Sequence, residues 1–175
     1  MNEFELIRTY FACQPVARRD VALGIGDDAA VLQPPPGQQL VVTTDLLVSG
    51  VHFLPDVEPA SLGHKALAVN LSDLAAMGAE PAWFLLNIAL PLVDEKWLAG
   101  FCDGLFALAR QYNVQLVGGD TSRGPLTIAI EAHGFVPAGQ ALTRSGARPG
   151  DRIFVTGTLG DAGLALRHRQ GRLQL

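Results

Sequence analysis

The spacing of apolar and polar positions predicts two long helices in this chain. Between residues 59 and 78 apolar positions recur at helical intervals, with Pro59 suited to a first helical turn and Gly78 to the position after the helix end. The segment 93–113 shows the same period, and Asp94 is placed to cap its first turn. Both segments are therefore expected to be amphipathic helices, each with one face in the core.

The remaining apolar segments are short and lie between turn residues, which is typical of strands. A short helix is expected at the start of the chain. The expected strands are at 20–26, 29–34, 40–53, 82–91, 114–120 and 126–136. This order of elements predicts an α+β fold, in which a mainly antiparallel sheet has the two long helices packed on one face.

A turn-rich segment at 143–151 suggests a domain boundary. Residues 1–148 are therefore expected to form one amino-terminal domain. Residues 149–175 are expected to be the start of a second, α/β domain, with a strand at 152–155 followed by a helix.

Composition favours a globular protein and excludes several classes. Hydrophobic residues make up 49% of the chain and charged residues 17%, and the net charge of −4 gives no electrostatic footprint for nucleic acid. No apolar stretch approaches the length of about 20 residues that a membrane helix needs. No signal peptide opens the chain, so a cytoplasmic location is expected. Cys13 and Cys102 lack metal-ligand spacing and are expected to be buried, reduced thiols.

Four aspartates end or interrupt apolar segments, and this pattern is the main chemical signal of the sequence. They are Asp28, Asp45, Asp73 and Asp120. A carboxylate in apolar surroundings is costly unless a cation or hydrogen bonds compensate it. Each aspartate also has an ordinary structural explanation, as a turn or strand cap, an arginine partner or the start of an Asx-turn.

Taken together, the four aspartates suggest a metal site, since the segments that carry them are expected to meet at one edge of the sheet. Carboxylates with the hydroxyls of Thr43 and Thr44 are hard oxygen ligands, which favour Mg²⁺ over zinc or copper. Glycine-rich corners at 24–26 and 118–119 beside such a site suggest a nucleoside triphosphate.

The phosphate-binding motifs of other kinases are missing from the sequence. No GxxxxGK[ST] loop and no protein-kinase motif occurs, so the phosphates would be held through metal ions rather than through a lysine cradle. Arg144 is the best candidate for direct phosphate contact because its guanidinium suits phosphate oxygens, although a solvated turn arginine is an equal alternative.

Five stretches resemble the thiamine-monophosphate kinase family, within the superfamily of aminoimidazole ribonucleotide synthetase. They run in order along nearly the whole chain, which makes the resemblance specific. The stretches are GIGDDAAVL, TTDLLVSGVHF, KALAVNLSDLAAMGAEP, GGDTSRGPL and GFVPAGQALTRSGARPGD. The resemblance implies phosphorylation of thiamine phosphate to thiamine diphosphate, with ATP as co-substrate and Mg²⁺ as cofactor, by direct transfer without a covalent intermediate.

The resemblance also implies roles for individual residues. Without it, His52 would be taken for a surface histidine, and Glu131 and His133 are expected at the surface. The implied metal ligands are Asp28, Asp45, Asp73 and Asp120, with a hydroxyl and backbone pair from Thr43 and Thr44; the implied contact to thiamine phosphate is His52; and the implied nucleotide-binding positions are Gly119, Asp120 and Arg144.

Family members are about twice as long as this chain, so the resemblance implies that it corresponds to the amino-terminal half of such an enzyme. It further implies a homodimer in which the sheets of two chains close into a barrel, with nucleotide near the interface. Two alternatives stay open. The chain could belong to another ATP-dependent member of the superfamily, such as selenophosphate synthetase or the hydrogenase-maturation dehydratase, or it could be a non-catalytic dimerisation fragment.

Overall fold

The computed structural model describes residues 2–174, which form two compact units. The first unit ends at Leu142 and the second begins at Thr143. This division falls at the start of the turn-rich segment and so before residue 148, where the sequence suggested a boundary.

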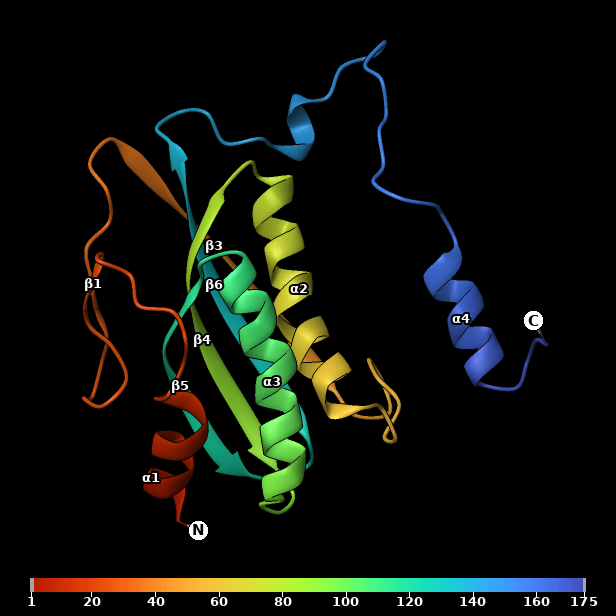
Figure 1. Ribbon diagram of the computed structural model, residues 1–175. Helices are drawn as coiled ribbons and strands as arrows, with labels where there is room; N and C mark the ends of the chain where they lie inside the picture. Colours follow the sequence, from red (N-terminus) through yellow and green to blue (C-terminus); the bar gives the residue numbers. More distant parts are fainter. Residues whose placement is uncertain (1, 175) are drawn as a thin grey trace. The chain divides into compact units, whose positions relative to one another are not determined.

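A four-stranded sheet forms the centre of the first unit (Figure 1). Its strands, in spatial order, are β3 (Gln38–Val48), β6 (Thr127–Pro137), β4 (Glu80–Leu90) and β5 (Gln115–Arg123). β3 pairs with β6 and β6 with β4 in antiparallel fashion, whereas β4 and β5 are parallel. The sheet is therefore mixed, and the expectation of a mainly antiparallel sheet missed this parallel pair. The helix between β4 and β5 is the crossover connection that a parallel pair requires.

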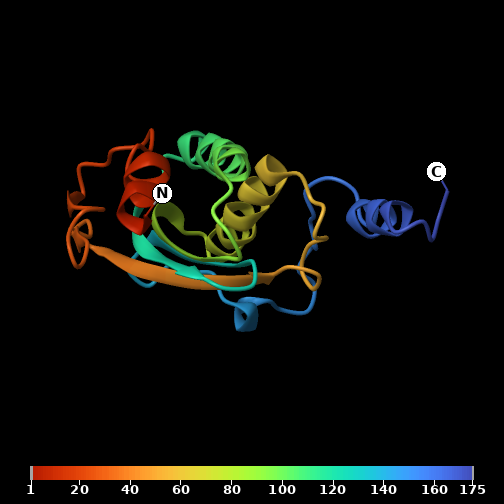
Figure 2. The same ribbon diagram turned by 90° about the horizontal axis from the view of Figure 1, so that it is seen from below.

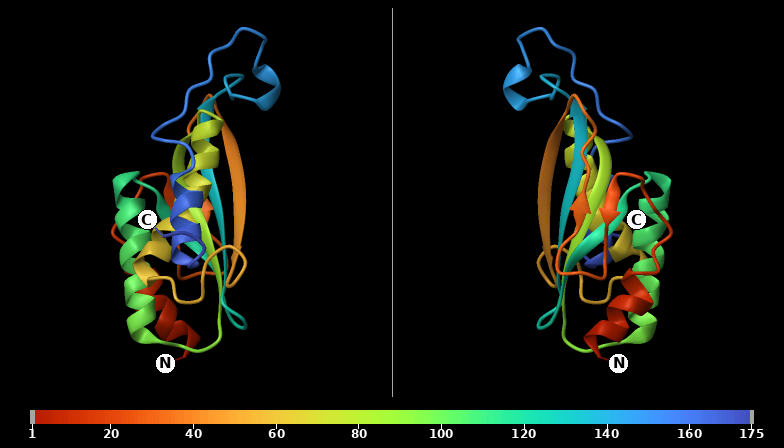
Figure 3. Two further views of the ribbon diagram at one scale, coloured as in Figure 1. Left: turned by 90° about the vertical axis from the view of Figure 1, so that its right-hand side faces the viewer. Right: turned by 90° about the vertical axis from the view of Figure 1, so that its left-hand side faces the viewer.

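The two long helices, α2 (Pro59–Ala76) and α3 (Glu95–Gln111), lie on the same face of this sheet, as expected (Figures 2 and 3). The Asp94 carboxylate accepts a hydrogen bond from the Trp97 backbone N–H, so the predicted cap of α3 is confirmed. Glu58 caps α2 in the same way, because its carboxylate accepts from the backbone N–H groups of Ala60 and Ser61. The sequence analysis did not identify Glu58 as a cap.

Most of the core lies between these helices and the sheet. It includes the fully buried side chains Leu62, Leu67, Leu74, Phe84, Phe101, Leu105, Ile128 and Ile130. Two glycines let the helix backbones touch. A Cβ atom on Gly63 would lie 2.0 Å from the Phe101 carbonyl oxygen, and one on Gly104 would lie 1.9 Å from that of Ala60. Any larger residue at either position would force α2 and α3 apart.

Among the described residues of the first unit, the segment that contains β1 (Val21–Leu23) and β2 (Val31–Leu32) covers one part of the opposite face of the sheet. These two strands pair antiparallel, and a small second core forms around Ala82, Trp83, Val117 and Phe135. The rings of Trp83 and Phe135 meet edge to face with centroids 4.9 Å apart. The rest of this face is open.

A partly buried ion pair fixes the start of β1 to the sheet. Arg18 Nη2 lies 2.7 Å from Asp20 Oδ2, and Trp83 Nε1 donates to Asp20 Oδ1 at 3.0 Å. Burial alone would raise the pKa of Asp20, but the hydrogen bonds from Arg18 and Trp83 outweigh it, so the pKa is lowered. Asp20 is therefore a structural carboxylate that remains ionised.

The amino-terminal segment is helical, as expected, with α1 (Glu3–Leu6) continuing into a π-helical turn, η1 (Ile7–Phe11). Asn2 and Glu5 cap each other at its start.

The two cysteines differ in exposure. Burial raises the pKa of the Cys102 thiol to about 12, which keeps it protonated and unreactive. Cys13 is exposed, contrary to the expectation that both thiols are buried.

The second unit contains a short 3₁₀ helix, η2 (Arg144–Gly146), and α4 (Asp161–Arg169). The strand expected at 152–155 does not form, and Ile153, Phe154 and Val155 are exposed. A strand needs a partner for its backbone hydrogen bonds, and the described part of this unit contains no other strand.

Throughout residues 2–174, the helices are either too short or too polar to cross a lipid bilayer.

Candidate functional site

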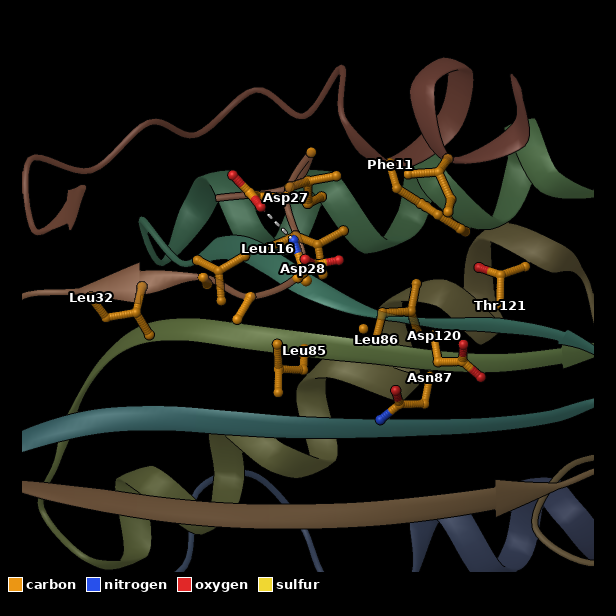
Figure 4. Close-up of a pocket in the computed structure, with 18 of the residues that line it drawn as sticks. Phe11, Asp27, Asp28, Leu32, Leu85, Leu86, Asn87, Leu116, Asp120 and Thr121 are labelled. Carbon is orange, nitrogen blue, oxygen red and sulfur yellow. Dashed lines mark hydrogen bonds between the residues drawn. The ribbon is translucent and has the colours of Figure 1, made fainter. Parts of the chain in front are cut away.

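A pocket of about 800 Å³ lies beside the β5 edge of the sheet (Figure 4). The Gly-Asp-Asp corner between β1 and β2, the amino-terminal helical segment and the strands β4 and β5 contribute its walls. One part of the lining is apolar, with Phe4, Ile7, Phe11, Ile25, Leu32, Leu85, Leu116 and Val117; the other part is polar, with Asp27, Asp28, Asn87, Asp120, Thr121 and His133. An amphipathic pocket of this size suits a ligand with one apolar and one charged end.

The corner brings two adjacent aspartates to the pocket. The Asp28 backbone N–H donates to Asp27 Oδ1 at 2.8 Å, so part of the Asp27 charge is compensated by the backbone. Gly26 precedes them with a φ of +127°, a conformation that favours glycine. Both carboxylates are exposed to solvent, so the cost of burying them that the sequence suggested does not arise at this corner.

Asp120 reaches the same pocket from β5. It is the register partner of Asn87 on β4, and Ser122 Oγ donates to Asp120 Oδ2 at 2.8 Å. Gly119 has a φ of +139°, and a Cβ atom there would lie 1.9 Å from the Leu86 carbonyl oxygen. Gly119 thus allows β4 to come close, and it also lines the pocket.

A second group of the predicted residues lies on the helix-covered side of the sheet. Thr43 Oγ1 donates to Asp73 Oδ2 at 2.8 Å, which joins β3 to the last turns of α2. Asp45 lies two residues further along β3 and therefore on the same face as Thr43. Thr44 faces the other side, and its hydroxyl donates to the Ile130 carbonyl oxygen at 3.1 Å. Only the backbone of Thr44 is thus available on the side of Asp45 and Asp73.

The four aspartates do not converge on one point within this chain, contrary to the expectation from the sequence. Among residues 2–174, no three side chains of aspartate, glutamate, histidine or cysteine are placed to hold one metal ion together. Asp28 and Asp120 line the pocket, whereas Asp45 and Asp73 lie across the sheet. The donor set still fits Mg²⁺, which commonly takes only one or two carboxylates and completes its coordination with water and substrate phosphates.

His52 lies in the turn after β3, and its position is tightly fixed. The Val48 backbone N–H donates to His52 Nδ1 at 3.0 Å, and Lys65 Nζ on α2 donates to the His52 carbonyl oxygen at 2.6 Å. The neighbouring Phe53 is buried in the core. Arg144 is exposed at the start of η2 in the second unit, so it is not among the residues that the first unit brings together.

His133 lines the pocket, although the sequence analysis placed it at the surface together with Glu131. Its side chain is 13% exposed, and Nε2 lies 3.2 Å from Glu131 Oε1. Burial lowers the pKa of His133, and the attraction of Glu131 opposes this only in part. Strand alternation correctly put His133 on the face away from the helices. What it could not show is that the β1–β2 segment covers this position.

Comparisons with known proteins agree with the motifs. Residues 26–136 match the model of the family "AIR synthase related protein, N-terminal domain". The chain is similar to the thiamine-monophosphate kinase of Escherichia coli (strain K12), with 60% identity over 99% of this chain and 54% of that protein. The chain spans about half the length of the curated relatives it matches.

Solved structures show the same fold. The crystal structure of thiamine-monophosphate kinase from Stenotrophomonas maltophilia K279a matches with a TM-score of 0.83 and 57% identity, over 90% of this chain and 50% of that one. A structure described as AaThiL complexed with AMPPCP and TMP matches with a TM-score of 0.71 and 36% identity, over 86% of this chain and 49% of that one. The family match covers more than half of the sequence, and this chain therefore belongs to the family of AIR synthase related proteins, as an amino-terminal domain.

Proposed function

We propose that the chain is the nucleotide- and metal-binding half of an enzyme that phosphorylates thiamine phosphate to thiamine diphosphate with ATP. The observation that carries this proposal is the pocket, in which Asp28 and the Gly119–Asp120 pair of β5 lie together. These motifs are distant in the sequence, and both are among the stretches that resemble the kinase family. The relatives named thiamine-monophosphate kinase support the choice of acceptor.

The carboxylates of Asp28, Asp45, Asp73 and Asp120, the Thr43 hydroxyl and the Thr44 backbone would hold Mg²⁺. Bound there with ATP, Mg²⁺ would neutralise charge on the phosphates and so lower the barrier between two anionic reactants. The hydrogen bond from Thr43 to Asp73 holds that carboxylate in one orientation. Preorganised ligands of this kind reduce the reorganisation that binding requires.

The transfer we propose is direct and in line, from the γ-phosphoryl group of ATP to a phosphate oxygen of thiamine phosphate. The acceptor oxygen is already anionic, so the chain needs no strong general base, and none of its pocket residues is assigned as a nucleophile. His52 would hold the acceptor phosphate, Arg144 would contact the phosphates of ATP, and Gly119 with Asp120 would border the nucleotide. Catalysis would then consist of positioning and charge compensation.

We further propose that two chains pair through the open face of the sheet into a barrel-like homodimer with nucleotide near the interface. Leu40, Val42 and Leu46 on β3 are large, exposed and on that face. These exposed apolar side chains support this proposal, because a second copy seated on them would remove them from water. A cytoplasmic location fits an enzyme whose substrate is ATP.

The proposed function is tested by measuring thiamine diphosphate formation from thiamine phosphate and ATP, with and without Mg²⁺, by this chain and by its Asp73→Asn variant. Product that depends on Mg²⁺ and falls at least tenfold in the variant is the expected result, a loss of about 1.4 kcal/mol or more in transition-state stabilisation. Failure of the folded chain to bind nucleotide would favour the non-catalytic dimerisation fragment. Turnover without Mg²⁺ would contradict the metal assignment.

A further inference from the structure

The turn that carries His52 is held by a reciprocal pair of hydrogen bonds with the end of β3. The Val48 backbone N–H donates to His52 Nδ1 at 3.0 Å, and the His52 backbone N–H donates to the Val48 carbonyl oxygen at 2.9 Å. A backbone N–H can only donate, so Nδ1 is the acceptor. The hydrogen of the neutral ring therefore lies on Nε2.

Further contacts fix this turn on both sides. Gly50 N–H donates to the Phe53 carbonyl oxygen at 2.8 Å, and the buried Phe53 side chain anchors the end of the turn in the core. Ser49 N–H donates to the Leu126 carbonyl oxygen at 3.2 Å, which ties the start of the turn to the residue before β6. The backbone around His52 is thus held in place, whereas its ring is exposed.

Among the described residues, a side-chain hydrogen bond from Lys65 links α2 to this turn. Its Nζ donates to the His52 carbonyl oxygen at 2.6 Å, a short charge-assisted hydrogen bond. The other lysine, Lys96, is exposed on α3 and has no such role in the described contacts. Lys65 lies inside α2, whose apolar side chains pack in the core, and its side chain is exposed.

We infer that the Val48 N–H fixes His52 in the Nε2–H tautomer and that Lys65 is a positioning residue that holds the His52 backbone in place for this contact, so that the ring presents a single donor to an anionic oxygen. The inference rests on the proposed function in one respect, since the anion would be the phosphate of the acceptor. A phosphate oxygen accepts hydrogen bonds only, and so it matches an imidazole that offers N–H and not the lone pair. In the other tautomer, the exposed lone pair of Nε2 would repel that oxygen.

The tautomer can be read directly from long-range ¹H–¹⁵N spectra of the histidine rings, recorded on the chain above the ordinary pKa of histidine. We expect His52 to show a protonated Nε2 and an unprotonated Nδ1, with a preference on the order of tenfold, the size that one net hydrogen bond supplies. A preference for Nδ1–H, or an even mixture, would overturn the inference.

The role of Lys65 is tested with Lys65→Met, which keeps the apolar stem but loses the donor, and with Lys65→Arg, which keeps a donor. Lys65→Met is expected to reduce the tautomer preference of His52 several-fold, and Lys65→Arg to restore most of it. Lys96→Met is the matched control and should leave the His52 signals unchanged. An unchanged tautomer ratio in Lys65→Met would contradict the positioning role, and far-ultraviolet circular dichroism separates this result from a loss of fold.

Titration with thiamine phosphate tests the proposed substrate contact of His52 separately from the tautomer of its ring. We expect the His52 Nε2–H signal to move on addition of thiamine phosphate and not on addition of unphosphorylated thiamine. If neither compound moves it, the proposed substrate contact of His52 fails, while the tautomer measurement still decides how His52 is held. If both move it equally, the ring does not recognise the phosphate, and the inference is contradicted.

Discussion

Two neighbouring residues of β3 show how differently the two faces of the sheet are built. Leu47 points toward the helices and is 6% exposed, whereas Leu46 points to the opposite face and is 54% exposed. Both are leucines in the same strand, and each pairs with β6. The helix-covered face thus completes its core within one chain, and the other face leaves large apolar side chains in water.

This difference separates the face that stabilises the fold from the face on which a ligand or a partner could bind. The core under α2 and α3 supplies stability and holds Asp73 against Thr43. The opposite face carries Asp120 in the pocket and the exposed side chains of β3. Contiguous exposed apolar side chains typically mark an interaction surface, which is the basis for the proposed dimer.

The largest effect is expected at the contact between β5 and β4 beside the pocket. Gly119→Ala would place a Cβ atom 1.9 Å from the Leu86 carbonyl oxygen in a conformation that disfavours side chains. A loss on the order of 4 kcal/mol in the free energy of unfolding follows, because neither backbone can yield without breaking the parallel pair. Urea unfolding measures this loss.

Gly118→Ala is the matched control for this substitution. A Cβ atom there would lie 3.2 Å from Leu85 Cδ2, the flexible end of a side chain, so a change of no more than about 1 kcal/mol is expected. Equal effects of the two substitutions would show that the close approach of Gly119 to β4 is not the constraint described.

The different contributions of the two faces to stability are tested most simply by replacing Leu46 and Leu47 of β3 in turn. Leu47→Ala is expected to cost about 2–5 kcal/mol in the free energy of unfolding, because it leaves a cavity in the core. Leu46→Ala should cost no more than about 0.5 kcal/mol in the single chain, since its side chain is largely in water already. Urea unfolding at low protein concentration compares them.

In a measurement of self-association, Leu46→Ala is expected to have the larger direct effect, whereas in unfolding Leu47→Ala has the larger effect. If the open face binds a second copy, Leu46→Ala weakens the association seen in sedimentation equilibrium, whereas Leu47→Ala acts on it only through the fold. A monomeric wild-type chain, or an association that Leu46→Ala does not change, would contradict the proposed role of this face.

The smallest expected effect is a pH dependence from His133, which lies on the sheet face away from the helices. Burial lowers the pKa of His133 in the folded chain, with Glu131 opposing it. The unfolded chain therefore binds a proton at higher pH than the folded chain. His133 consequently costs stability as the pH falls through the ordinary histidine pKa of about 6.5, and it costs nothing well above that pH.

Two variants test this pH dependence by urea unfolding across that range. His133→Gln removes the titrating group, so the stability advantage of wild type over His133→Gln should shrink as the pH falls. Glu131→Gln removes the opposing attraction and should deepen the loss of stability at low pH. Parallel pH profiles of all three proteins would show that His133 titrates alike in the folded and unfolded chains.

Local patterns predicted local structure well. Helical spacing located α2 and α3, and Asp94 identified the start of α3 from its residue type alone. The parallel pairing of β4 with β5 was missed, because pairing direction depends on contacts between distant segments. The strand at 152–155 was wrong for the same reason, since apolar β-branched residues favour a strand only where a partner strand is present.

The arrangement of the predicted site residues could be predicted only in part. Asp28 and Asp120 were both singled out from the sequence, and the structure brings them to one pocket. Asp45 and Asp73 were expected beside them, but the alternation of β3 places Asp45 on the other face. His133 was missed because its burial depends on the β1–β2 segment, which is remote in sequence and folds over that part of β6.

The proposed function requires that the pocket bind nucleotide through metal-dependent contacts of its aspartates. The most direct test is a calorimetric titration of the chain with the ATP analogue AMPPCP, with and without Mg²⁺. Binding that needs Mg²⁺ and weakens about tenfold or more in Asp120→Asn is predicted, while Asp103→Asn, an exposed aspartate of α3, should bind as wild type does. Equal affinity without Mg²⁺, or full affinity in Asp120→Asn, would contradict the account.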